Sequence, residues 1–164
     1  MMTRASRDSF IAAMRVYPAA VTIIATGHAP QRAGLTATAV CSLSADPPRL
    51  LACVNATSGT AAAVLRNRVF SVNLLAPSQE VLAGRFASPG ITGDARFEGD
   101  LWHQEGEAPL LRGATAGFLC RLAEHHLAGS HRVLIGDCLE VSHLSDPALV
   151  YRDGAFSAVG AAIP

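Results

Sequence analysis

The sequence predicts a mainly β protein, a closed or split β-barrel with a few short flanking helices. Strand-like apolar runs dominate the order of segments, and only a few short segments have helical spacing. Two of the runs, 115–127 and 130–144, are long and are joined at Ala128-Gly129. With 164 residues, the whole chain (1–164) is expected to form a single domain with a proper core.

The N-terminal part is predicted to contain one helix and one buried strand. Ser6 is expected to cap a helix that runs to about Val16, and Pro18 ends it. Residues 20–26 are apolar and β-branched, which predicts a buried strand. Residues 27–34 then form a polar turn that leads into the central stretch of the chain.

The central stretch, 34–48, alternates small hydroxyl residues with small apolar ones. A backbone of this kind can approach a ligand closely while hydroxyls and amides face it, although an ordinary strand, turn and strand would look similar. The stretch ends at Asp46-Pro47-Pro48, which forces a turn before the strand 50–54. Residues 55–60 then cap a helix over 61–65, and a helix N-terminus with free amides can bind phosphate. A stretch of small residues that a ligand can approach closely, followed by an anion site, indicates a nucleotide-like ligand.

The middle of the chain is predicted to be less regular. Residues 69–75 form a strand, and Ser78 caps a helix over 79–87. Residues 88–101 carry three glycines, a proline and four charges, which is typical of a lid or a slack loop. The irregular chain continues over 102–109, and two leucines at 110 and 111 return it to the core.

The run 130–144 has apolar residues on both faces. Period-two alternation places four of them on one face: Val133, Ile135, Leu139 and Val141. Leu134 and Cys138 make the other face apolar as well. Such a strand needs a covering layer, either a helix or a second subunit. The whole chain is 50% hydrophobic and 16% charged, which also favours a subunit interface.

Composition and motifs argue against several classes of protein. The net charge is zero without a basic patch, which argues against nucleic acid as a partner. No leader and no apolar run near ~20 residues is visible, so a cytoplasmic protein without a membrane span is expected. Four widely spaced cysteines predict buried, reduced thiols and no metal site. No Gly-x-Gly-x-x-Gly links a strand to a helix, which argues against a Rossmann site for NAD.

Six segments between residues 8 and 158 resemble the flavin reductase family, the small enzymes that supply reduced flavin to two-component monooxygenases. In chain order they are Gly34–Ala37, Ser42–Pro48, Val54–Thr60, Phe70–Leu75, Gly129–Gly136 and Leu149–Phe156. The resemblance implies an FMN-binding split barrel that forms a homodimer and binds FMN or FAD. It also implies NADH or NADPH as co-substrate and a separate oxygenase that receives the reduced flavin.

The resemblance assigns roles to individual residues. His131, in Gly129-Ser130-His131, matches the histidine that faces the nicotinamide side of the flavin, so it is the expected catalytic residue. His125 and His126 are adjacent, point to opposite faces of a strand and cannot share a metal. The expected cofactor-binding residues are Thr36, Ala37, Thr38, Ala39, Ser42, Leu43, Ser44, Asn55, Ser58, Thr60, Arg85, Phe86, Tyr151 and Phe156. The last two could equally be core aromatics.

Two other functions remain open on the sequence. One keeps the fold and changes the electron acceptor, for example to a corrin. The other is a non-catalytic flavin-binding protein that would bind flavin tightly and ignore NADH. A pyridoxamine-phosphate oxidase is disfavoured because residues 55–60 contain no arginine for the phosphate.

Overall fold

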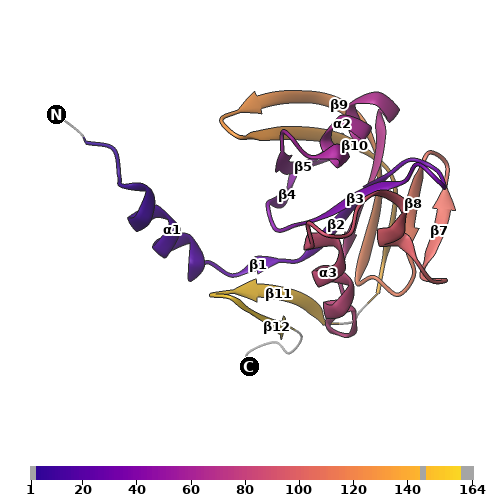
Figure 1. Ribbon diagram of the computed structural model, residues 1–164. Helices are drawn as coiled ribbons and strands as arrows, with labels where there is room; N and C mark the ends of the chain where they lie inside the picture. The colour runs from indigo at the N-terminus through magenta and orange to yellow at the C-terminus, as the bar shows by residue number, and fades with distance from the viewer. Residues whose placement is uncertain (1–2, 145–146, 160–164) are drawn as a thin grey trace.

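The computed structural model describes residues 3–144 and 147–159. Its largest sheet has the strand order β3-β2-β6-β9-β10-β5-β4, and all its neighbouring strands are antiparallel (Figure 1). These strands are β2 (Thr22–Thr26), β3 (Ala33–Ala37), β4 (Val40–Ala45), β5 (Pro48–Asn55), β6 (Val69–Leu74), β9 (Ala116–Ala128) and β10 (His131–His143). The prediction of a mainly β protein is confirmed.

Two small sheets and a few short helices surround the large sheet. The small sheets consist of β1 (Ala19–Ala20), β11 (Ala148–Arg152) and β12 (Ala155–Val159), and of the hairpin β7 (Trp102–Glu105) and β8 (Ala108–Leu111). The helices are α1 (Arg7–Arg15), α2 (Gly59–Asn67), α3 (Glu80–Ala87), η1 (Pro77–Gln79) and η2 (Gly93–Phe97). None of the helices in residues 3–144 and 147–159 is long and apolar enough to cross a membrane.

The core is divided into two main clusters by the strand β2. All five residues of β2 are buried, and successive side chains point to opposite faces of the sheet. Ile23 therefore joins the cluster around Phe86 and Trp102, whereas Ile24 joins the cluster around Phe70. Each fully buried side chain of this size contributes roughly 1.5–3 kcal/mol to stability. Burial on both faces explains why this segment is a continuous β-branched apolar run.

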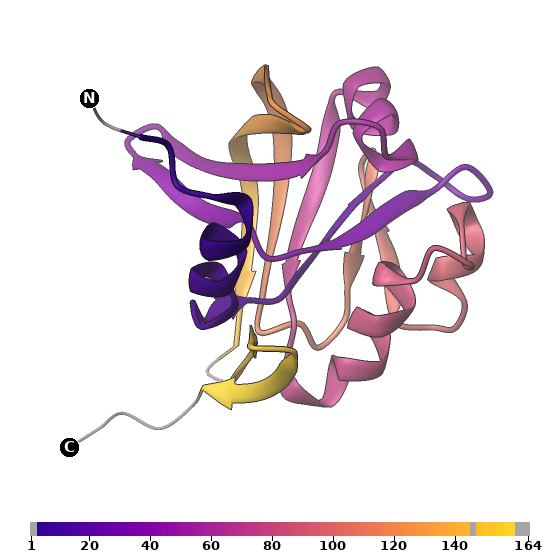
Figure 2. The same cartoon turned by 60° about the vertical axis from the view of Figure 1, so that its left-hand side comes forward.

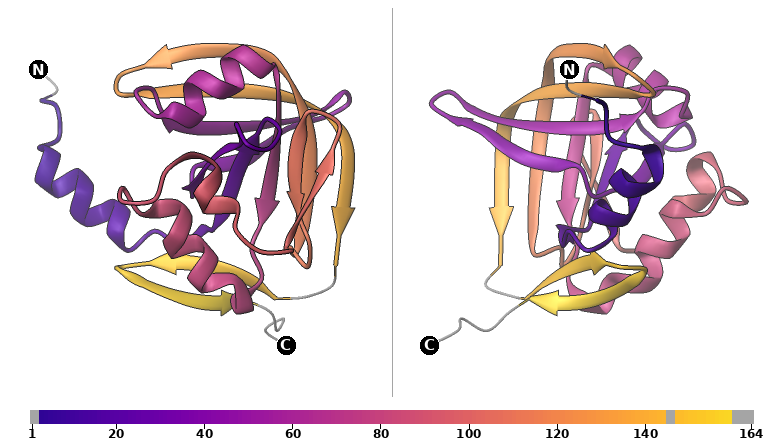
Figure 3. Two further views of the ribbon diagram at one scale, coloured as in Figure 1. Left: turned by 45° about the vertical axis from the view of Figure 1, so that its right-hand side comes forward. Right: turned by 90° about the vertical axis from the view of Figure 1, so that its left-hand side faces the viewer.

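The long strands β9 and β10 bend midway, as Figures 2 and 3 show. Their pairing shifts register after Ile135 and again after Cys138, and such bulges bend a strand. Gly136 is required at the bend because a Cβ there would lie 2.8 Å from the Phe70 ring. Beyond the bend, Leu139 and Val141 are 49% and 57% exposed in the single chain, so no helix of the described residues supplies the covering layer that the sequence predicts for this face, and a second subunit stays a prediction.

The segment that follows α3 is more ordered than the sequence suggests. Residues 102–109, predicted to be irregular, form most of the β7–β8 hairpin. Phe97 and Trp102 are buried and stack on Phe86, with ring centroids 4.9 to 5.3 Å apart. The segment 88–101, predicted to be a lid or a slack loop, is irregular except for the 3₁₀ turn η2, and Phe97 anchors it in the core. Contrary to the prediction, Ser78 does not cap α3, because it lies inside the 3₁₀ turn η1 that precedes the helix.

The helix α1 projects away from the body of the molecule (Figure 1). Its predicted cap is confirmed, since Ser6 Oγ accepts a hydrogen bond from the Ser9 amide at 3.2 Å. No residue of α1 is buried. Its C-terminal end is attached to the β11–β12 turn, where the Asp153 amide and side chain both bind Arg15. Cys41 is exposed, contrary to the expectation that every thiol is buried, and all four cysteines are unpaired.

Candidate functional site

The candidate site is a groove with two lobes that both contact β3. The larger lobe, about 800 Å³, lies between β3, the start of α2, the end of α3 and residues 87–96. The smaller lobe, about 230 Å³, lies between β3, the end of β5 and the start of β10. The lobes share three lining residues, Leu35, Thr36 and Asn55. Small-molecule sites in proteins usually have volumes of about 300–1,000 Å³.

The N-terminus of α2 opens into the larger lobe. Ser58 caps the helix, because its Oγ accepts from the Ala61 amide at 3.0 Å and donates to the Asn55 carbonyl at 2.8 Å. The hydroxyl of Ser58 is thus occupied in building the helix end. The amides of Gly59 and Thr60 precede the first intrahelical bonds and stay available to a ligand. Gly59 has no side chain to cover these amides. The space beside it is open, since a Cβ added at Gly59 would meet no atom within 4 Å.

Asn55 stands between the two lobes and is oriented by its own turn. Its Oδ1 accepts hydrogen bonds from the amide of Thr57 at 2.9 Å and from the hydroxyl of Thr57 at 2.8 Å. The oxygen is therefore occupied, and the amide nitrogen of the side chain remains as a donor. Together with the free amides of α2, this nitrogen makes a donor set that suits an anion.

The β3 strand and the two residues that follow it supply the small residues of the groove. Thr36 lines both lobes, whereas Ala37, Thr38 and Ala39 line the smaller one. One detail differs from the expectation that hydroxyls face a ligand. Thr36 Oγ1 donates to the Ala83 carbonyl of α3 at 2.7 Å, so this hydroxyl holds the helix against the strand.

The sequence argument missed two arginines in the larger lobe, since it found no arginine in residues 55–60 and named only Arg85 elsewhere. Arg66 comes from the last turn of α2, and Arg96 comes from η2. Burial lowers the pKa of Arg96, which nevertheless stays charged at neutral pH. The lobe thus combines a helix N-terminus with two cations. The only hint in the sequence is that Arg96 is a basic residue in the segment 88–101, which is predicted to be a loop.

His131 lies on the rim of the smaller lobe, at the start of β10. It is directly opposite Asn55 in the β5–β10 pairing, which places it beside the junction of the two lobes. Its Nδ1 is 3.0 Å from Ser130 Oγ, and the side chain is exposed. A ring held at Nδ1 by a hydroxyl can direct Nε2 toward a bound molecule. His125 and His126, which were not expected to take part, lie elsewhere on the hairpin, with His125 hydrogen-bonded to Arg132 and His126 near Glu124.

The remaining predicted cofactor residues fall into three groups. Phe86 and Thr60 line the larger lobe and are buried. Arg85 donates to the Glu98 carbonyl instead, and Phe156 stacks on Tyr151 and packs against the core. Neither of these two lines the groove. The third group also lies elsewhere: Ser42 and Ser44 line a separate apolar cavity beside β4, Leu43 is exposed, and Tyr151 lines the cavity beneath α1.

The fold and the groove together define a class of protein, the split-barrel flavoproteins that hold a nucleotide between a small-residue strand and a helix N-terminus. The donor set at α2 fits a phosphate, and the small residues of β3 line both lobes beside it. Comparison with known proteins makes the assignment specific. The family model described as "Flavin reductase like domain" matches residues 14–160.

Relatives and solved structures agree with this match. The chain is 41% identical over 131 residues to the FMN reductase (NADH) RutF 2 of Methylorubrum extorquens, covering 79% of this chain and 76% of the relative. It is 36% identical to the FMN reductase (NADH) RutF of Enterobacter cloacae, covering 96% and 97%. BorF, the flavin reductase component of a bacterial two-component tryptophan halogenase, superposes with a TM-score of 0.87 at 28% identity, covering 96% and 100%.

The chain belongs to the flavin reductase family. The predictions of the family, of the split barrel and of an oxidoreductase are thereby confirmed. The individual site residues stay predictions, because the groove locates them without showing what they touch.

Proposed function

We propose that this protein reduces FMN with NADH and releases the reduced flavin. The single observation that carries the proposal is the two-lobed groove, which has a donor-rich helix end in one lobe and His131 on the rim of the other. The relatives named FMN reductase (NADH) support this choice of flavin and nicotinamide. The absence of a Gly-x-Gly-x-x-Gly segment is compatible with NADH that lies against the flavin without a domain of its own.

Each part of the groove has a task in this proposal. The free amides of Gly59 and Thr60, with the side-chain nitrogen of Asn55, hold the flavin phosphate. The backbone and small side chains of β3 support the ring, and His131 positions the nicotinamide on the open side. Arg66 and Arg96 add positive charge around the phosphate. The bound flavin supplies the hydride acceptor, so the residues contribute orientation and electrostatics.

The proposal includes a separate oxygenase in the cytoplasm as the consumer of the reduced flavin. BorF is the reductase component of a two-component system, which supports a similar division of labour. Transfer to another protein requires that the flavin can leave. The exposed rim of Thr38, Ala39 and His131 is compatible with such exchange.

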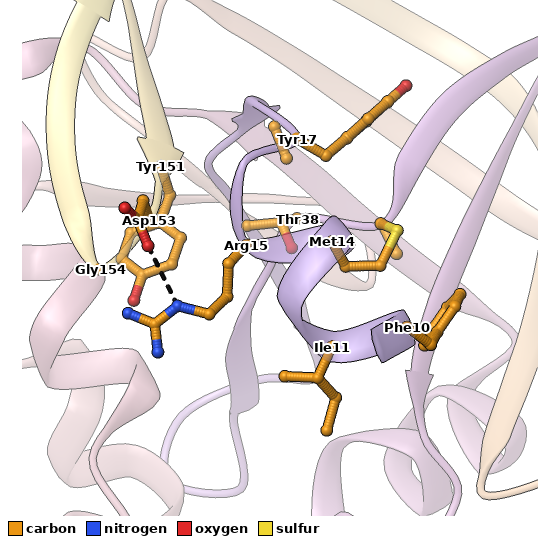
Figure 4. Close-up of a pocket in the computed structure, with 11 residues that line it drawn as sticks. Phe10, Ile11, Met14, Arg15, Tyr17, Thr38, Tyr151, Asp153 and Gly154 are labelled. Atoms are coloured by element: carbon orange, nitrogen blue, oxygen red, sulfur yellow. Dashed lines mark hydrogen bonds and ion pairs between the residues drawn. The ribbon is translucent and has the colours of Figure 1, made fainter. Parts of the chain in front are cut away.

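We also propose that the protein is a homodimer. Several large apolar side chains are exposed on α1, among them Phe10 at 62% and Met14 at 48%. They line a cavity of about 500 Å³ together with Thr38 and Tyr151 (Figure 4). A second apolar cavity, about 320 Å³, lies beside β4 and the exposed half of β10. Patches of this kind on a small protein usually mark an interface.

A steady-state comparison of both flavins with both nicotinamides tests the proposed activity. NADH consumption should be proportional to enzyme and should depend on added FMN, with lower kcat/KM for at least one of FAD and NADPH. Oxygen should be consumed as the released flavin reoxidises. The proposal is defeated if purified protein oxidises neither nicotinamide with either flavin.

A further inference from the structure

The segment between α3 and β7 forms one wall of the larger lobe. Four of its residues line that lobe, Pro89, Thr92, Gly93 and Arg96, next to Ala87 at the end of α3. It contains little regular structure, and only Phe97 of η2 is buried. A wall of this composition would be mobile by itself, so its position depends on the side chains that attach it to the barrel.

Arg96 attaches this wall at three points. Its Nε donates to the Ile91 carbonyl at 2.6 Å, and its Nη2 donates to the Ser88 carbonyl at 2.7 Å. Its Nη1 donates to the Gly34 carbonyl of β3 at 2.5 Å. One planar guanidinium therefore folds the segment on itself and fixes it to the strand that supports the ligand. A lysine cannot do this, because its ammonium lacks the fixed fork of donors.

A second arginine attaches the same segment from outside the lobe. Arg32 forms a two-point ion pair with Asp94, at 2.6 and 3.0 Å, and its guanidinium lies 4.8 Å from the centre of the Phe97 ring. Arg32 does not line the larger lobe. The charge of Arg32 is balanced by a carboxylate, whereas Arg96 has only carbonyl partners among the described residues.

We propose that Arg96 is a positioning residue for flavin binding, which fixes the 88–97 wall to β3 and leaves an unbalanced positive charge beside the phosphate site. This inference rests on the proposed function, since it names the flavin as the molecule that the wall holds. Three of the five N–H donors of Arg96 are used by carbonyls. The side chain lines the lobe that contains the α2 N-terminus.

Two substitutions of Arg96 distinguish its attachment of the 88–97 wall from its positive charge. Arg96→Lys keeps the charge and loses the three-point attachment, whereas Arg96→Gln loses both. We expect the Kd for FMN, measured by calorimetry, and the KM for FMN to rise about tenfold in Arg96→Lys and further in Arg96→Gln. The kcat at saturating FMN should stay within about twofold, because neither variant touches the reacting atoms. Wild-type Kd and KM in both variants would overturn the proposal.

Amide hydrogen exchange provides a readout that does not depend on activity. Exchange over residues 88–95 should accelerate in both Arg96 variants, without FMN present, while exchange in β6 and β9 stays unchanged. Asp94→Asn, which breaks the outer attachment only, should accelerate exchange over the same residues but raise the Kd less than either Arg96 variant, because both the three-point attachment and the charge of Arg96 remain. Arg112→Gln, an exposed arginine outside the groove, is the matched control and should change neither quantity.

The results also separate this inference from the proposed activity. A wild-type protein that binds FMN without oxidising NADH defeats the proposed function, whereas the Kd and exchange data still decide the role of Arg96. Unchanged exchange over 88–95 in Arg96→Gln would show that the side chain does not hold the wall, whatever the activity. A general loss of folding in Arg96→Gln would appear as faster exchange in β6 and β9. In that case the Kd and the exchange of Arg96→Lys, the milder change, decide the role of Arg96.

Discussion

His131 is the residue on which the chemical proposal depends most directly. His131→Ala removes the ring from the rim of the smaller lobe but leaves the donor set at α2 intact. We expect kcat to fall at least about tenfold through poorer alignment of the nicotinamide, with the Kd for FMN within about twofold of wild type. His126→Ala, an exposed histidine of the same hairpin near Glu124, should behave as wild type. An unchanged kcat would remove His131 from the mechanism.

Among the glycines that the structure describes, Gly34 is the one where an added methyl group would make the shortest contact. A Cβ there would lie 2.7 Å from the Phe86 ring, 3.0 Å from the Phe97 ring and 3.0 Å from the Ile24 carbonyl. Gly34→Ala should therefore destabilise the protein by about 1–3 kcal/mol through overpacking, measured by urea denaturation. Gly84→Ala is the matched control, because a Cβ on α3 would meet nothing within 4 Å. It should stabilise by roughly 0.5–1 kcal/mol.

The site residues that sequence reasoning found and those it missed differ in how local their signals are. Ser58 and Asn55 belong to one short cap motif, and their hydrogen bonds stay within that motif. Arg96 acts on Gly34, 62 residues away in the sequence. No pattern among neighbouring residues in the sequence predicts such a contact. The same distance explains why the Thr36 hydroxyl, assigned to a ligand, is instead bonded to Ala83 of another element.

At the scale of elements, the ion pair that attaches the 88–97 segment should contribute less to stability at acidic pH. The hydrogen bond from Arg32 lowers the pKa of Asp94 below its ordinary value of 3.8. The contribution of this pair to stability is therefore present above that value and is lost as the pH falls through the lowered pKa. At pH 7, Asp94→Asn should lower the unfolding free energy by about 1–2 kcal/mol. The difference in Tm between wild type and variant should shrink below about pH 4; a constant difference would contradict the assignment.

Elements with strong local signals were predicted well, and those with weak signals were not. The caps of α1 and α2 and the long β9–β10 hairpin were all found from the sequence. The β7–β8 hairpin was missed because its strands have four residues each and one of them contains a proline. Its position is fixed by tertiary contacts instead, since Trp102 packs on Phe86 and Phe97.

At the scale of the whole molecule, the exposed apolar faces predict that the subunit does not occur alone. Val141→Asp places a charge beside the apolar cavity at β4 and β10. If a second copy covers this face, burying the charge is costly and the protein should become monomeric, as measured by light scattering during gel filtration. Val81→Asp, at a valine of α3 that is 81% exposed, should leave the assembly unchanged. A monomeric wild type would contradict the dimer.

The overall architecture could be predicted because periodicity carries it, whereas the bend in β9 and β10 could not. Strict alternation along 130–144 assigns one face to Val133, Ile135, Leu139 and Val141. The two register shifts break that alternation, and Gly136, beside the first of them, leaves the space that the Phe70 ring needs. A bulge of this kind follows from packing between distant strands, which a single sequence does not display.

The aromatic cluster behind the groove has a practical consequence. Trp102 is the only tryptophan of the chain, it is 9% exposed, and its ring centroid lies 5.3 Å from that of Phe86, which lines the larger lobe. Its intrinsic fluorescence therefore originates beside the proposed flavin pocket, where resonance energy transfer to a bound isoalloxazine should quench it. The chain carries its own optical probe for titrating the ligand.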